Sequence, residues 1–312
     1  MTSLFRLFLV LLSTCILASP AAAGRAEVLA LAKKGWVYQL RTTMIGRDMS
    51  IPVRINGRFL AGASICLVGE RPHPETQEVL DQFRALLASV HGKSVPMRYA
   101  GPTARLCGAG RTVVVRLYSG RPPNSALTDD LFWLSESYQL GLPPDRVYRA
   151  ASPAMAQTFF GRLGAGTHVM VKQADHVDLT PLEQAFYRSI LIEELFQTFT
   201  FGMDILHFDA YGAFTSKLQE LPYDLRRLPW DSEPFMRHLL RSNPSGLCQF
   251  DLFMLHAVAR APVERTNSDA FLAYIDAQYD DLESLTAATL ADPRFATLID
   301  PGCGRLLEAQ SD

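Results

Sequence analysis

The segment from Thr180 to Gly202 constrains the fold most, because its sequence specifies a long helix with a defined start. Thr180 and Glu183 have the spacing of a capping box, in which each side chain accepts a hydrogen bond from a backbone N–H at the helix start. Pro181 suits the first helical position, where no N–H donor is needed. Apolar residues then recur at helical spacing up to Phe199. We therefore predict a well-capped amphipathic helix around which the rest of the chain is organised.

The polar side chains of this helix fall on one arc. At about 100° per residue, Glu193, Gln197, Glu194 and Thr198 lie together, with the apolar side chains opposite. A zinc-protease helix carries two His residues four positions apart, so that both imidazoles reach one metal ion, and a Glu that polarises the metal-bound water. Here Glu193 and Gln197 stand at the two His positions, and Glu194 stands at the position of the base.

The residue types at these positions do not suit a catalytic zinc. Gln197 offers only a neutral amide, which is a weak zinc ligand, and Met203 stands where the extended motif has its third His. His207 lies four residues further along and reaches the area only if the connection bends back. We therefore predict no metal ion and no cofactor.

Three interpretations of the polar arc remain open. The residue types alone favour the ordinary solvated face of an amphipathic helix. The second interpretation is a ligand-binding cleft. The third is an atypical metal-dependent hydrolase, with Glu194 as the general base and a metal set such as Glu193 and His207.

The pattern of the remaining chain predicts an α+β fold. Seven segments have the composition of strands: 36–40, 51–55, 63–68, 95–99, 111–118, 156–162 and 167–173. Seven segments have helical periodicity: 26–34, 74–90, 125–138, 180–202, 233–240, 250–260 and 269–290. We expect a mixed sheet with packed helices over 24–202 and a mainly helical subdomain over 203–312.

The N-terminal segment predicts export. Residues 1–23 have the organisation of a secretory signal peptide, with Arg6 in the charged region, an apolar core over 7–18 and small residues at 21–23. The apolar run is shorter than the roughly 20 residues of a membrane-spanning helix, and no later stretch approaches that length. Cys15 fits a lipoprotein signal poorly, so lipid anchoring is not expected. We expect a periplasmic or extracellular protein without a transmembrane span.

The cysteines suggest disulfide bonds. Four of them remain after removal of residues 1–23, and an even number in an exported chain points to two structural disulfides. Four cysteines allow three pairings. Order along the chain favours Cys66–Cys107 and Cys248–Cys303, and the other two pairings stay open.

Several other classes of site have no support. A formal net charge of −2 gives no electrostatic case for binding nucleic acid. The chain has no nucleophile elbow, P-loop or dinucleotide-binding motif. Asp129 and Asp130 are adjacent, so on a helix their side chains diverge, and we expect both to be exposed. His168 lies near a predicted turn and is expected at the surface.

A longer pattern surrounds the polar arc. Its first element is Glu193-Glu194-Leu195, then Gln197, Phe199 and, seven residues after the Gln, Asp204. Ala213-Phe214 and the segment 249–255 form two further elements. This pattern, over about 169–260, resembles a family of secreted bacterial proteins of unknown function. That family is similar to degenerate zincin (metzincin-like) metalloproteases, with Glu-Glu-x-x-Gln in place of His-Glu-x-x-His.

The resemblance implies a zincin-like fold, in which the helix over 74–90 packs on the sheet beside the central helix. Thr200 departs from the pattern, because the family usually has Gly there, so the turn that ends the helix is expected to differ. The resemblance implies no established activity or substrate.

We expect an exported protein that acts by binding a peptide or a cell-envelope protein in a cleft along the sheet edge. The alternative is a metal-dependent hydrolase or peptidase. In that case Glu194 is the catalytic candidate. The binding candidates are Glu193, Gln197, Thr198, Asp204 and His207.

Overall fold

The computed structural model describes residues 20–39 and 53–304. Its main feature is a five-stranded sheet in the order β2-β1-β3-β5-β4, which places β2 and β4 at the two edges. Four strands are parallel to their neighbours, and β4 alone runs antiparallel, paired with β5. The α+β class with a mixed sheet is therefore confirmed. The strands are β1 (Ser64–Gly69), β2 (Met97–Gly101), β3 (Thr112–Tyr118), β4 (Ala154–Gly161) and β5 (Gly164–Lys172).

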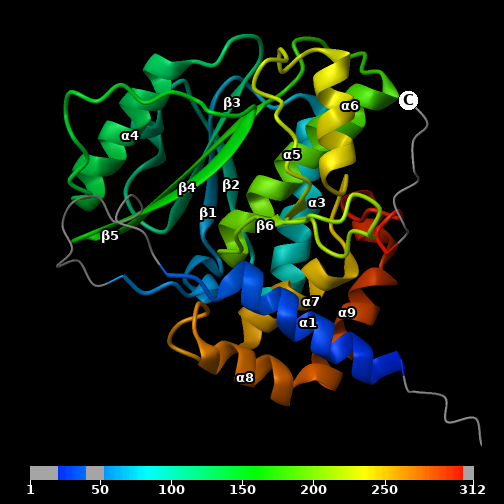
Figure 1. Cartoon of the computed structure of the whole chain (residues 1–312). Helices are drawn as coiled ribbons and strands as arrows, with labels where there is room; N and C mark the ends of the chain where they lie inside the picture. The colour runs from blue at the N-terminus through cyan, green and yellow to red at the C-terminus, as the bar shows by residue number, and fades with distance from the viewer. Residues whose placement is uncertain (1–19, 40–52, 305–312) are drawn as a thin grey trace, which may run out of the picture.

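Helices cover both faces of this sheet (Figure 1). Helix α4 lies on one face, and α3 and α5 lie side by side on the other. Helix α7 packs against α3 and α9, and α1 packs against α8. The helices are α1 (Pro20–Trp36), α3 (Pro74–His91), α4 (Asn124–Tyr138), α5 (Pro181–Thr200), α6 (Glu233–Ser242), α7 (Gln249–Arg260), α8 (Asp269–Ala277) and α9 (Tyr279–Leu290).

The alternation of side chains along β3 explains the two layers. Val113, Val115 and Leu117 belong to the apolar cluster that includes α3 and α5. Val114 and Tyr118 belong to the cluster on the α4 side. Successive residues of a strand point to opposite faces, so a strand that is apolar throughout is buried on both faces. The predicted buried strand over 111–118 is confirmed.

Helix α5 begins and ends through specific backbone contacts. The predicted capping box is present: Thr180 Oγ1 accepts from the Glu183 N–H at 3.3 Å, and Glu183 Oε2 accepts from the Thr180 N–H at 2.8 Å. At the other end Phe201 adopts a left-handed conformation with φ of 56°. Its N–H donates to the Gln197 carbonyl at 2.8 Å. A Cβ on Gly202 would lie 2.5 Å from a Leu218 carbon, so only Gly fits where the chain leaves the helix.

Both favoured disulfides are present. Cys66 pairs with Cys107 and Cys248 pairs with Cys303, with Cα–Cα distances of 5.8 and 5.6 Å. Within 20–39 and 53–304, no helix combines the length and apolar character needed to span a membrane. Two disulfides fit an exported protein. Residues 1–19 of the predicted signal segment, including Cys15, lie outside the described residues.

The five strand predictions from residue 63 onward are confirmed to within three residues, and the two earlier ones are wrong in their described parts. Trp36 ends α1 instead of beginning a strand, and neither 37–39 nor 53–55 forms regular structure. The Trp36 indole N–H donates to the Thr200 carbonyl at 3.0 Å, so a tertiary contact with α5 overrides the β propensity of this residue. The predicted helix over 269–290 is two helices, with a break at Gln278.

The predicted division between 24–202 and 203–312 stays a prediction. One apolar cluster includes Phe196 of α5 and Met254 of α7, from either side of that boundary. The connection after α5 is largely irregular, as expected, and contains two short parallel strands, β6 (Ile205–Leu206) and β7 (Gln219–Glu220).

A buried ionic cluster joins α4 to the sheet and corrects two predictions. The Asp130 side chain has no exposed surface, and His168 is 1% exposed, so neither is a surface residue. Arg116 donates to both Asp130 oxygens at 2.5 and 2.8 Å, and His168 Nε2 lies 3.0 Å from Oδ2. Burial alone would raise the pKa of Asp130, but hydrogen bonds from His168 and Arg116 hold it at about 2. Because Asp130 follows the exposed Asp129 directly, the sequence does not indicate that Asp130 is buried.

Asp130→Asn should lower the unfolding free energy at neutral pH by about 3–5 kcal/mol, because it leaves the Arg116 charge buried without its partner. The pKa of Asp130 is depressed in the folded state, so its contribution is present above about pH 4 and is lost as pH falls through about 2. Urea unfolding of both proteins measures the difference. The control is Asp129→Asn, an exposed neighbour, expected within about 0.5 kcal/mol of wild type. Equal effects of the two substitutions would contradict the assignment.

Candidate functional site

A cleft of about 600 Å³ lies beside the C-terminal half of α5. It is bounded by α5, by the residues that lead into β4, by the segment after β7 and by α6. Part of its wall is apolar, from Ile190, Leu221, Trp230, Phe235 and Leu239. Its polar lining is dominated by carboxyl groups, from Glu193, Glu194, Asp204, Glu220 and Asp224.

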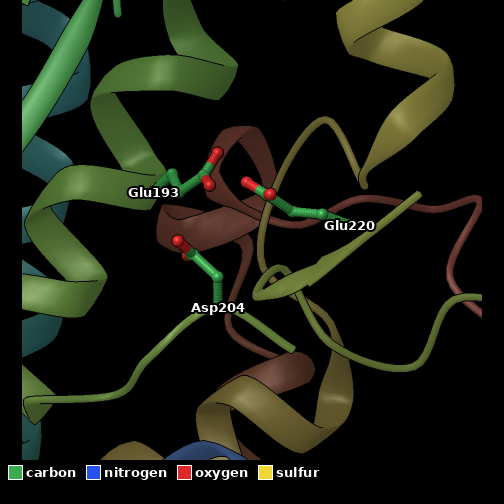
Figure 2. A group of neighbouring side chains, drawn as sticks. All are labelled: Glu193, Asp204 and Glu220. Atoms are coloured by element: carbon green, nitrogen blue, oxygen red, sulfur yellow. The ribbon is translucent and has the colours of Figure 1, made fainter. Parts of the chain in front are cut away.

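Three of these carboxyl groups converge, although they come from three segments (Figure 2). Glu193 lies on α5, Asp204 follows the end of that helix, and Glu220 ends β7. One carboxylate oxygen of each lies within 4.8 Å of the other two. The pairing of β6 with β7 brings them together, since the His207 N–H donates to the Glu220 carbonyl at 2.8 Å.

Lys217 is a buried residue that holds the side chain of Glu193 in position at the cleft. The lysine side chain has no exposed surface, and its Nζ lies 3.0 Å from Glu193 Oε2. The same ammonium donates to Ser189 Oγ at 2.9 Å, Asn243 Oδ1 at 3.1 Å and the Pro244 carbonyl at 2.7 Å. The Asn243 amide in turn donates to Glu193 Oε2 at 2.8 Å. Two donors therefore fix one oxygen of Glu193.

Gln197 has a comparable role toward Asp204. Its amide nitrogen donates to Asp204 Oδ1, across the turn that ends α5. Gln197 lies one helical turn beyond Glu193, so both side chains are directed into the same cleft. The amide that is a weak zinc ligand is a good donor to a carboxylate.

The crowding of carboxyl groups raises their proton affinity. Burial, and then repulsion from Glu193, raise the pKa of Asp204 to about 6, although Gln197 and Lys217 partly oppose the shift. Burial and the charges of Asp204 and Glu193 raise the pKa of Glu220 to about 8. At neutral pH Glu220 therefore carries a proton.

Glu194 is the most strongly perturbed acid of the cleft. Burial, with repulsion from Glu193 and Asp204, raises its pKa well above the usual range. One oxygen accepts a hydrogen bond from the Ala156 N–H of β4, and Oε2 has no partner among the described residues. The raised pKa favours the protonated form of Glu194, which can donate a proton.

The structure brings four of the predicted site residues together around the cleft: Glu193, Glu194, Gln197 and Asp204. Thr198 and His207 do not line it. Thr198 is buried, and the His207 ring lies 5.3 Å from the Phe214 ring. The interpretation as a solvated helix face is wrong, because Glu193 and Glu194 are each only 9% exposed.

Sequence reasoning missed Glu220, Lys217 and Asn243. All three lie in the part of the chain after Gly202, where no periodic pattern identifies functional residues. Their approach to α5 depends on contacts between residues about 25 to 50 positions apart.

Comparison of the chain with protein-family models, with curated proteins and with solved structures finds no match. The resemblance to degenerate zincins therefore stays a prediction, and the geometry of the cleft is the basis for the function.

Glu220→Gln should stabilise the protein increasingly as pH rises. The pKa of Glu220 is raised in the folded state, so its stabilisation is complete below about pH 4.5 and is lost as pH rises through about 8. Glutamine does not ionise, so the variant does not lose this stability as pH rises. Urea unfolding with a chelator present, at about pH 5 and about pH 8, measures the change.

The control for this experiment is Glu27→Gln, an exposed carboxyl on α1, whose difference from wild type should be the same at both pH values. An advantage of Glu220→Gln that shrinks toward high pH would contradict the placement of Glu220 among other acids.

Proposed function

We propose that the protein acts by binding an extended segment of a peptide or of a cell-envelope protein in the cleft beside α5. One observation carries this proposal: the cleft lies where the edge strand β4 begins, with residues 151–154 in its wall. An edge strand presents backbone N–H and C=O groups that can pair with an added strand.

The register of β4 indicates which groups are directed outward. The Lys172 N–H donates to the Pro153 carbonyl, so Pro153 forms a hydrogen-bonded pair with β5. In an antiparallel pair such residues alternate with residues whose backbone groups point away. Ala154, Ala156 and Thr158 therefore direct their N–H and C=O groups toward the free edge. The contact from Ala156 to Glu194 agrees with this direction.

The apolar wall supplies a place for a side chain of the bound segment. Leu221, Trp230 and Phe235 lie opposite the polar residues of α5 in the same cleft. A cleft of about 600 Å³ is within the usual range for ligand sites, about 300–1,000 Å³. Backbone pairing would provide affinity, and this wall would provide selectivity.

Two further observations support the proposal. Helices α3 and α5 lie side by side, and Arg188 of α5 lies 3.2 Å from Glu78 of α3, which is the arrangement that the resemblance to zincins implies. Two disulfides fit a protein that meets its partner outside the cytoplasm.

Ala151→Trp should abolish or weaken peptide binding by at least about tenfold, or 1.4 kcal/mol, by filling the cleft from an exposed position in its wall. The probe is a random peptide library displayed on phage and selected against the full chain. Affinities of the selected synthetic peptides are then measured by calorimetry. Ala288→Trp, at an exposed alanine of α9 outside the cleft, is the matched control and should bind as wild type. Failure to enrich any peptide, or equal binding to Ala151→Trp, would refute the proposal.

A second candidate is a hydrolase that uses Glu194. The specific observation in its favour is a buried carboxyl group with a raised pKa and an unpartnered oxygen in a cleft. The raised pKa of Glu194 favours a role as general acid over the predicted role as base.

Glu194→Gln separates the two candidates. Glutamine has the shape of a protonated glutamate and can still accept from the Ala156 N–H. Under the binding proposal, wild type does not cleave a mixture of quenched fluorescent peptides, and Glu194→Gln keeps peptide affinity within about twofold. Cleavage by wild type that is lost in Glu194→Gln would establish the hydrolase instead.

A further inference from the structure

The acidic floor of the cleft has features that peptide binding does not require. Glu193, Asp204 and Glu220 present oxygen atoms to one point, with all three within 4.8 Å of one another (Figure 2). They come from α5, from the segment after α5 and from β7. Their convergence is therefore a product of the tertiary fold and not of local sequence.

Oxygen atoms no more than 4.8 Å apart can all contact one hard cation. Calcium binds carboxylate oxygens at about 2.3–2.6 Å in flexible geometry, which suits three groups carried by different segments. Magnesium demands a near-octahedral set and is usually bound through one or two carboxylates and several waters. The three groups offer only carboxylate oxygens, whereas zinc sites in proteins are rich in His and Cys ligands.

The charge balance also favours a cation. The ion pair from Lys217 to Glu193 offsets one carboxylate. Arg226 lines the same cleft but is paired with Asp224 at 2.9 Å. Asp204 receives the neutral amide of Gln197. Of the ionised carboxylates on the floor, Asp204 is therefore the one without an ion pair among the described residues.

Glu194 provides an independent observation. It lines the same cleft, is 9% exposed, and has an Oε2 with no hydrogen-bond partner among the described residues. A buried polar atom is normally paired with protein or with ordered water. A water molecule bound to a cation on the neighbouring carboxylates would form a hydrogen bond with this oxygen.

We propose that Glu193, Asp204 and Glu220 form a calcium site on the floor of the cleft. Lys217 and Asn243 both bind Oε2 of Glu193. Neither of them binds Oε1, so this oxygen can bind the ion. Gln197 positions Asp204 in the same way. This proposal departs from the prediction of no metal ion, which depended on the residue types at 193, 197 and 203; of these positions the calcium site uses Glu193 alone. It exists whether or not a peptide binds.

Calcium should bind the full, chelator-treated chain as one ion, with a dissociation constant in the range of extracellular modules, about 10⁻⁴–10⁻³ M or tighter. Calorimetry with CaCl₂, MgCl₂ and ZnCl₂ in separate titrations measures affinity and preference. Terbium, which shares the oxygen preference of calcium, gives a second signal, because Tyr223 and Trp230 line the same cleft and sensitise its emission.

Asp204→Asn and Glu220→Gln should each weaken calcium binding by at least about tenfold. Both substitutions keep the side-chain shape, and near-UV circular dichroism verifies that each variant is folded. The matched control is Asp129→Asn, an exposed carboxyl of α4 outside the cleft, and it should bind calcium as wild type.

Three results would overturn the site: no heat and no terbium emission with the wild-type chain, equal calcium affinity of wild type and the two ligand variants, or tighter binding of Mg²⁺ or Zn²⁺ than of Ca²⁺. None of these results affects the selection of peptides by the cleft, which is measured with Ala151→Trp, so the two proposals fail separately.

Discussion

The burial of Lys217 is the interaction on which the cleft depends. Its ammonium contacts Ser189 and Glu193 on α5 and the Pro244 carbonyl just after α6. Its backbone N–H donates to Asp251 of α7 at 2.7 Å. One residue of an otherwise irregular connection therefore joins three helices. A charge with no exposed surface requires a complete set of acceptors, so the connection cannot move without breaking all of these bonds together.

This arrangement explains how the cleft keeps several acids close together. Buried like charges repel one another, and the fold responds in two ways. Lys217 pairs with Glu193, and the raised pKa values of Glu194 and Glu220 favour their protonated forms. A buried ion pair does not stabilise a fold more than apolar residues of the same volume would. Crowded acids with raised pKa values are common at functional sites, which is why we place the proposed function in this cleft. In the Asp130 cluster on the other face of the sheet, Arg116 and His168 contact a single buried acid, so the cluster contributes to the stability of the fold.

The elements that sequence predicts well are those with local signals. The capping box of α5 and the apolar run of β3 each depend on neighbouring residues. The disulfide pairing followed the order of the chain. Trp36 was mispredicted because its partner, the Thr200 carbonyl, lies 164 positions away. Glu220 and Lys217 were missed for the same reason: nothing near them in sequence indicates that α5 will cover them. The site residues on α5 were thus predictable from the sequence. The burial of these residues and the partners that they contact were not.

Glu194 shows most clearly how α5 differs from a zinc-protease helix. In such a helix the dication on the two His residues offsets the charge of the neighbouring Glu and keeps it ionised as a base. Here Glu193 and Gln197 use the same one-turn spacing to hold Lys217 and Asp204, so the positive charge beside Glu194 is a single ammonium that is already paired with Glu193. Burial and repulsion from Glu193 and Asp204 therefore raise the pKa of Glu194 and favour its protonated form, and the carboxyl group accepts a hydrogen bond from the Ala156 N–H of the edge strand. The one-turn spacing of positions 193 and 197 is the same in both kinds of helix. The residue types at these positions determine whether the environment of Glu194 favours its ionised or its protonated form.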